Sequence, residues 1–363
     1  MKRALFYITL FLISASRANC QEAGDPLSAG FRIHSGLNLP VYNALDYLVD
    51  EGINAVDLFY QRQSTGNHFQ DELWNYPATG AGYSYWSTGN NEVFGKAHVL
   101  YADIQVPLTN ADHIVNFGTR TSAGIAYFTR SFDVENNNLN RAIGSHLNIY
   151  MNLSAYCKIR IIKGFEAVLD GGLVHFSNGK TRSPNYGINA ATVSAGLMYN
   201  FSSGIKYKSF PEMPPVPGRY FHSVLLSGGR KVYDDLSGEK FLSTTVSYGL
   251  DRYLTRSGKA GFGADIFYDG SIKKGLEEKG LAGTGFSEQL RMGVHASYSL
   301  CYKKTVAGVQ LGYYLYSKFT VLTRMYTRIS LNYILTDNIS AGFSIRSHFG
   351  KADALEYGII YTW

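Results

Sequence analysis

The chain has 363 residues, a formal net charge of +6, 14% aromatic residues and 38 glycines against nine prolines. Without Lys2, Arg3 and Arg17 of the first twenty residues, the charge falls to +3, an excess too small to indicate a nucleic-acid-binding protein. The 28 tyrosines, together with the many glycines, are typical of a membrane β-barrel, in which tyrosines line both membrane interfaces. A soluble β-sandwich has a similar composition, so the strand pattern has to decide between them.

The first segment, residues 1–20, predicts a cleaved secretory signal peptide. Two basic residues precede an apolar run at 4–15, and small residues follow it. This run is short for a membrane-spanning helix. We expect cleavage after Ala18 or Cys20. Lipidation of Cys20 is the alternative, which its basic neighbour Arg17 disfavours.

The remainder, residues 21–363, is predicted to form successive β-strands, because apolar and polar residues alternate with period two between turn residues. The clearest segments are 96–106, 113–128, 146–161, 162–175, 191–201, 241–250, 261–268, 291–302, 306–316, 326–335, 339–348 and 355–363. Their lengths fit the tilted strands of a barrel wall. The predicted fold is all-β: an antiparallel transmembrane outer-membrane β-barrel of about 12–16 strands, with fourteen as the central value.

Connections of two lengths alternate along the chain. Long polar connections occur at 131–141, 178–188, 228–240 and 269–287, and short turns lie between them. Outer-membrane barrels place long loops outside the cell and short turns in the periplasm. The segment Ser202–Gly218, with four prolines, breaks this pattern: strand parity makes it periplasmic, yet it is long. The sequence leaves open whether it divides an eight-stranded unit from added strands.

The last strand carries a second indication of a barrel. Tyr357, Ile359, Tyr361 and Trp363 share one face, opposite a largely polar or small one. Such a strand with an aromatic last residue resembles the C-terminal signal by which outer-membrane barrels are recognised for insertion. The resemblance implies the barrel-assembly machinery as a partner; an ordinary amphipathic edge strand is the alternative.

A candidate catalytic pair follows from strand geometry. His175 and Ser177 are two residues apart at the end of a strand-like segment, so their side chains share a face and the imidazole can take the serine proton. Steps of two back from Ser177 pass through an apolar stripe, which should face lipid. Asn189 begins a similar stripe on the next segment. Polar groups facing lipid are costly unless they lie at the interface or have a function. This pattern indicates an enzyme whose substrate arrives from the membrane; ordinary turn residues at a strand end are the alternative.

The extended motif carries a family resemblance. His175-Phe176-Ser177-Asn178, followed by Pro184-Asn185-Tyr186-Gly187-Ile188 and Asn189, resembles the signature of the outer-membrane lipid A 3-O-deacylases of the PagL type. A weaker similarity covers residues 30–201, the deacylase-like region. The additional strands, at 219–363, resemble those of longer homologues that are also described as acyloxyacyl hydrolases. The PagL-type deacylases are β-barrel esterases that remove the acyl chain at the 3-position of lipid A.

The resemblance implies a role for each residue of the motif. Ser177 would be the nucleophile and His175 its general base, while Asn178 and backbone N–H groups around Gly179 would stabilise the oxyanion. At the third position the family has a glutamate and this chain has Asn189. An asparagine can still accept a hydrogen bond from the imidazole and fix its tautomer, but it carries no charge to stabilise imidazolium. We therefore expect a slower enzyme, or a barrel that binds lipid A without cleaving it.

The predicted function is that of an outer-membrane serine esterase acting on lipid A of lipopolysaccharide in the outer leaflet of a Gram-negative cell. It needs no cofactor and no metal. The first alternative is a non-catalytic barrel that binds lipopolysaccharide. The second is a channel or lipid transporter, whose polar lumen would include Glu166 and Asp170.

Overall fold

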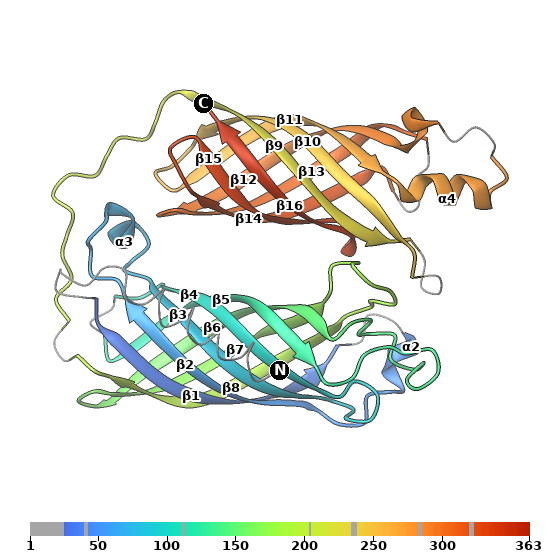
Figure 1. Ribbon diagram of the computed structural model, residues 1–363. Coiled ribbons are helices and arrows are strands. Elements are labelled where there is room, and N and C mark those ends of the chain that lie inside the picture. Colours follow the sequence, from blue (N-terminus) through green and yellow to red (C-terminus); the bar gives the residue numbers. More distant parts are fainter. Residues whose placement is uncertain are drawn as a thin grey trace, which may run out of the picture.

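Sixteen strands of the described chain form two closed antiparallel β-barrels (Figure 1). The computed structural model describes residues 25–39, 43–110, 113–202, 205–233, 238–281, 285–318 and 323–363, so the predicted signal peptide lies outside the described residues. The first barrel consists of β1 (Leu27–Asn38), β2 (Ile53–Gln63), β3 (Ala78–Thr88), β4 (Lys96–Pro107), β5 (Val115–Phe128), β6 (Leu147–Ile162), β7 (Phe165–Ser177) and β8 (Ile188–Asn200). The second consists of β9 (Tyr220–Val232), β10 (Lys240–Tyr253), β11 (Gly258–Asp269), β12 (Leu290–Tyr302), β13 (Thr305–Ser317), β14 (Met325–Ile334), β15 (Ile339–His348) and β16 (Lys351–Thr362).

The all-β barrel fold is confirmed, and sixteen strands lie at the upper end of the expected range. The expectation of one barrel spanning 21–363 differs from the structure, because the chain closes twice. Strand β8 pairs with β1, and β16 pairs with β9. Between them, Pro211, Pro214, Pro215 and Pro217 supply no N–H groups for a ladder, so the linker 201–219 leaves one sheet and begins another. The segment 202–218 thus divides two eight-stranded units. The sequence had left open whether it separates such a unit from added strands.

Each barrel is filled by its own side chains, as the narrow interior of an eight-stranded barrel requires. In the first barrel, Arg32 and Arg120 form ion pairs with Asp170 at 3.1 Å in the middle of the lumen. Towards one end, a buried aromatic cluster that includes Trp86 and Phe176 fills the interior. A single sixteen-stranded barrel would have left a wide aqueous interior.

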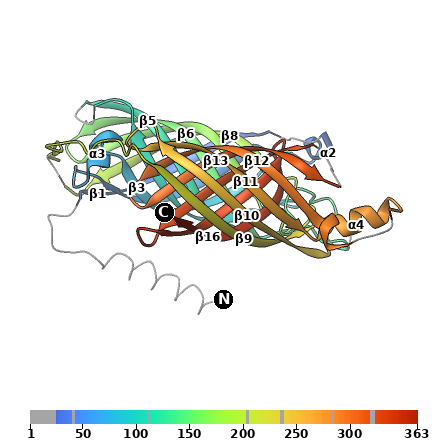
Figure 2. The ribbon, with the colours of Figure 1, turned by 90° about the horizontal axis from the view of Figure 1, so that it is seen from above.

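The two barrels lie side by side with their strands running in a similar direction (Figure 1). Odd-numbered strands finish at the end that carries α2 (Asn43–Asp46), α4 (Ser271–Glu278) and the short 3-10 helix η1 (Phe286–Gln289); we call it the site end. Figure 2 shows α2 and α4 together at this end and α3 (Phe69–Leu73) at the other, the linker end.

The barrels touch at the linker end through α3. The carboxylate of Asp71 accepts a hydrogen bond from the Tyr302 hydroxyl at 2.8 Å and lies 2.8 Å from Lys303 Nζ. Gln70 donates to the carbonyl oxygen of Cys301 at 3.2 Å. These contacts join the loop between β2 and β3 to the turn between β12 and β13.

Among the described residues, no helix has the length and apolar character needed to cross a membrane. On the final strand the expected face is present, since Tyr357, Ile359, Tyr361 and Trp363 are all exposed. Glu356, on the opposite face, is fully buried in the second lumen. The alternation read from the sequence is therefore the division between wall exterior and lumen.

Candidate active site

The three residues predicted to be catalytic, His175, Ser177 and Asn189, lie together at the site end of the first barrel. His175 is near the end of β7 and faces Asn189 directly across the β7–β8 ladder. Preceding residues on the same face of β7, Leu169 and Leu173, are 43% and 55% exposed, whereas Val174 is buried in the lumen. His175 and Ser177 therefore project outward from the barrel wall, at the end of an apolar stripe, as the alternation of residues predicted.

The side chains form a continuous hydrogen-bonded chain. His175 Nδ1 lies 2.7 Å from Asn189 Oδ1, and His175 Nε2 lies 2.8 Å from Ser177 Oγ. Because an amide oxygen can only accept, it selects the tautomer with the proton on Nδ1. Nε2 is then free to accept the serine proton. This arrangement is what an activated serine nucleophile requires.

Phe176 holds the pair in position. Its side chain points into the lumen, is fully buried, and packs edge-on against Trp86 and Phe128 with ring centroids 5.8 and 5.4 Å apart. Successive residues of a strand point to opposite faces. Fixing Phe176 in the lumen therefore fixes His175 and Ser177 on the outer wall.

The loop from Asn178 to Gly187 is tightly organised next to the pair. Asn185 Oδ1 accepts the backbone N–H of Asn178 at 2.9 Å, and Gly187 donates to the carbonyl oxygen of Ala142 at 3.0 Å. Gly187 has φ +75°, and a Cβ added there would lie 3.1 Å from His175 Cε1. Glycine is therefore required by conformation and by space. Asn185 and Gly187 belong to the sequence motif, but their positioning roles emerge only from the fold.

The Asn178 side chain does not have the oxyanion-stabilising role that was predicted for it. Its Nδ2 donates to Ser145 Oγ at 3.1 Å and to the carbonyl oxygen of Arg182 at 2.9 Å, so both amide hydrogens are used within the loops. The side chain therefore orders the loop and has no hydrogen left for an oxyanion. The backbone N–H of Gly179 donates to no other described residue, so its hydrogen remains available for an oxyanion. Ser145, from the preceding loop, could not have been found from the motif.

The second barrel touches this same loop. The backbone N–H of Val232, at the end of β9, donates to the carbonyl oxygen of Lys180 at 3.1 Å. A Cβ on Gly179 would lie 3.1 Å from the Leu355 side chain of β16. The candidate site is thus flanked by the second barrel.

Glu166 and Asp170 lie apart from the site, as expected. Asp170 is buried in the ion-pair network of the first lumen, and Glu166 accepts a hydrogen bond from Asn200 Nδ2 at 3.0 Å. Neither replaces Asn189 beside the imidazole. The described residues contain no group of three or more His, Cys, Asp or Glu side chains arranged to hold a metal ion.

Comparison with protein-family models matches each barrel to a model of its own. Residues 54–198 match the model described as lipid A 3-O-deacylase (PagL), and residues 220–363 match the acyloxyacyl hydrolase, C-terminal domain. The chain belongs to the PagL-type lipid A 3-O-deacylase and acyloxyacyl hydrolase family. The PagL model covers β7 and most of β8, so the outward-facing pair lies within the matched region.

The solved structures similar to this PagL-type chain include a crystal structure of the outer membrane enzyme PagL. The PagL chain is 17% identical to this one. The match covers 46% of this chain and 98% of the PagL chain, with a TM-score of 0.31. A triple mutant of Rhodopseudomonas blastica porin is 7% identical to this chain. That match covers 93% of this chain and 99% of the porin chain, with a TM-score of 0.18. The search of curated proteins finds no match. The family assignment therefore depends on the two family models, one described as a lipid A 3-O-deacylase and the other as the C-terminal domain of an acyloxyacyl hydrolase.

Proposed function

We propose that the first barrel is a serine esterase that removes an ester-linked acyl chain from lipid A, with Ser177 as nucleophile and His175 as general base. The observation that carries this proposal is the hydrogen-bonded chain from Asn189 through His175 to Ser177, on the outer face of the barrel wall. An ester in the outer leaflet can reach this face laterally, with its acyl chain still in the bilayer. No cofactor is needed.

The reaction follows from these positions. Ser177 Oγ attacks the ester carbonyl carbon while its proton passes to His175 Nε2. The tetrahedral oxyanion is stabilised by backbone N–H groups, with that of Gly179 as the candidate. As the intermediate collapses, the sugar oxygen leaves and takes the proton from the imidazolium. Water, activated by the same imidazole, then hydrolyses the acyl-serine and releases the fatty acid.

Asn189 limits the electrostatic part of this mechanism. Its Oδ1 orients the imidazole at 2.7 Å, but a neutral amide stabilises the imidazolium less than a carboxylate would. We therefore propose an esterase slower than relatives with glutamate here. A barrel that binds lipopolysaccharide without cleaving it is the second candidate, and the same substitution favours it.

A channel is the weaker candidate, because the first lumen is filled by ion pairs and by the aromatic cluster. For the cell, we propose export by the signal peptide at 1–20 and insertion by the barrel-assembly machinery through the aromatic face of β16. Both steps place the protein in the outer membrane with its site end outward, in contact with lipopolysaccharide.

Mass spectrometry of lipid A tests the esterase. The full chain and its Ser177→Ala variant are expressed in a Gram-negative host with fully acylated lipid A. Loss of one hydroxyacyl chain with the wild type alone is the expected result. Ser257→Ala, in a turn at the linker end, is the matched control and should behave as the wild type. Unchanged lipid A with folded wild-type protein would favour the binding barrel.

A further inference from the structure

A cavity of about 150 Å³ lies at the site end of the second barrel, beside the loop of the candidate active site. Its lining includes Lys180 from the first barrel and Lys231, Arg291, His348 and Lys351 from the second. A water occupies about 30 Å³ in the liquid. The cavity therefore has room for a small anion such as a phosphate group. Among its charged lining residues, four are cationic and one, Asp353, is a carboxylate.

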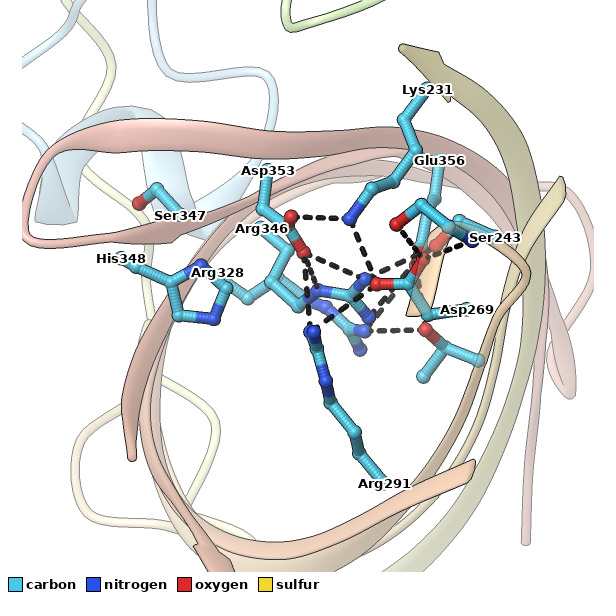
Figure 3. A network of polar contacts seen from close by, with 12 residues as sticks. Lys231, Ser243, Asp269, Arg291, Arg328, Arg346, Ser347, His348, Asp353 and Glu356 are labelled. Atoms are coloured by element: carbon cyan, nitrogen blue, oxygen red, sulfur yellow. Dashed lines mark hydrogen bonds and ion pairs between the residues drawn. The ribbon is translucent and has the colours of Figure 1, made fainter. Parts of the chain in front are cut away.

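Among the described residues, the buried charges beside this cavity do not balance. The buried network that forms its floor is drawn in Figure 3, where Lys231 lies 2.8 Å from Asp269 and Arg346 lies 2.9 Å from Asp353. Four buried cationic side chains form ion pairs with only three carboxylates; the cations are Lys231, Arg291, Arg328 and Arg346, and the carboxylates are Asp269, Asp353 and Glu356. Buried positive charge without a matching carboxylate is costly and favours binding of an anion.

Arg291 supplies an unused donor. It is 4% exposed and lines the cavity, and its Nε donates to no other described residue. Its Nη1 lies 3.3 Å from Asp269 and 3.8 Å from Asp353, longer than a good charged hydrogen bond. Buried guanidinium nitrogens without a described partner also occur on Arg32, Arg120, Arg328 and Arg346, but of these five arginines only Arg291 lines this cavity. A bound oxyanion would provide the missing acceptors, because guanidinium matches phosphate geometry.

The cavity is also close to the candidate nucleophile. Lys180 follows Ser177 by three residues, so their Cα atoms are at most about 11 Å apart. The hydrogen bond from Val232 to the carbonyl oxygen of Lys180 fixes this loop against the second barrel. A ligand in the cavity would thus lie at the same end of the protein as the reacting ester.

We propose that this cavity binds a phosphate group through Arg291 and Lys180, and that the group belongs to the phosphorylated sugar head group of the lipid substrate. The second part depends on the proposed esterase function, and the first does not. The second barrel then acts as a substrate-positioning domain. It holds the head group while the acyl ester meets Ser177 on the first barrel.

Binding of inorganic phosphate tests the anion site without any catalysis. Calorimetry on the full chain in detergent should show saturable binding that weakens about tenfold in Lys180→Gln. Arg291→Lys keeps the charge but removes the planar donor set, and should weaken binding similarly. Lys304→Gln, an exposed lysine at the linker end, is the matched control and should bind as the wild type. Absence of saturable binding, or equal loss in the control, would overturn the anion site.

Lipid binding by the Ser177→Ala protein identifies the source of the phosphate. Phosphorylated lipid A in micelles should bind about tenfold more tightly than the dephosphorylated lipid, and Lys180→Gln should remove that difference. If both lipids bind equally while inorganic phosphate still binds, the site takes soluble phosphate and the head-group assignment is overturned. Since neither measurement uses turnover, an inactive wild type would contradict the esterase and leave this result standing.

Discussion

His175 and Asn189 face each other across the β7–β8 ladder, with Nδ1 of the imidazole 2.7 Å from Oδ1 of the amide. The amide is neutral, so this contact orients the imidazole without a carboxylate charge. It fixes which imidazole nitrogen carries the proton, and therefore whether Ser177 meets an acceptor. The orientation of one amide thus governs the candidate catalytic chain.

Replacing Asn189 separates orientation from charge. Asn189→Leu removes the acceptor from Nδ1, and we expect kcat to fall about 100-fold or more. Asn189→Glu restores a carboxylate, and kcat should rise about tenfold because the imidazolium gains a charged partner. Release of fatty acid from lipid A in micelles measures both. Equal rates for the three proteins would show that Asn189 has no part in the reaction.

Gly187→Ala should disable the site and leave the barrel folded. The residue has φ +75°, and the new Cβ would lie 2.9 Å from the Phe176 carbonyl oxygen and 3.1 Å from His175 Cε1, so the loop and the imidazole have to shift relative to each other. We expect a loss of about tenfold or more in kcat, since small misplacements are costly in catalysis. The matched control is Gly238→Ala: φ is +62° there, but no described residue lies within 4 Å of the added Cβ. A similar loss in both variants would assign the effect to backbone strain alone.

Phe176→Ala should affect both stability and activity. The ring is fully buried among aromatic side chains, and its loss should lower the free energy of unfolding by about 3–5 kcal/mol. The end of β7 would then be free to shift, which separates His175 from Ser177. Urea unfolding in detergent measures the first effect and ester hydrolysis the second. Leu173→Ala, on the exposed face of the same strand, should change stability far less.

Glu356→Gln should destabilise the second barrel and spare the first. Its carboxylate is fully buried and accepts hydrogen bonds from Ser243 at 2.9 Å and Thr245 at 2.7 Å, and it lies 3.4 Å from Arg328 and from Arg346. Removing this charge leaves the buried Arg328 guanidinium without its carboxylate partner, at a cost of about 3–5 kcal/mol, whereas Arg346 keeps Asp353.

The comparison for this variant is Glu239→Gln, whose side chain is 55% exposed beside Lys274 and should change stability by less than about 1 kcal/mol. Unfolding is followed by limited proteolysis, with fragments assigned to each barrel by mass spectrometry. Simultaneous loss of both barrels in Glu356→Gln would show that they unfold as one unit.

The sequence by itself determined the all-β barrel class, the lipid-facing stripes and the outward projection of His175, Ser177 and Asn189. Each of these depends on the two-residue period of a strand, which is a local property that a one-dimensional pattern can carry. The signature motif likewise supplied the family, because its residues are close together along the chain.

Only the tertiary structure decided how the sheet closes. Whether β8 pairs with β1 or with a later strand depends on hydrogen bonds between segments about 170 residues apart, which no local pattern records. For the same reason, two contacts could not be predicted from the sequence. These are the hydrogen bond from Asn178 Nδ2 to Ser145 Oγ and that from the Val232 N–H to the Lys180 carbonyl oxygen. The alternation of apolar and polar residues determines which face of the sheet a side chain occupies. Barrel closure and packing determine which residues distant in sequence it contacts there.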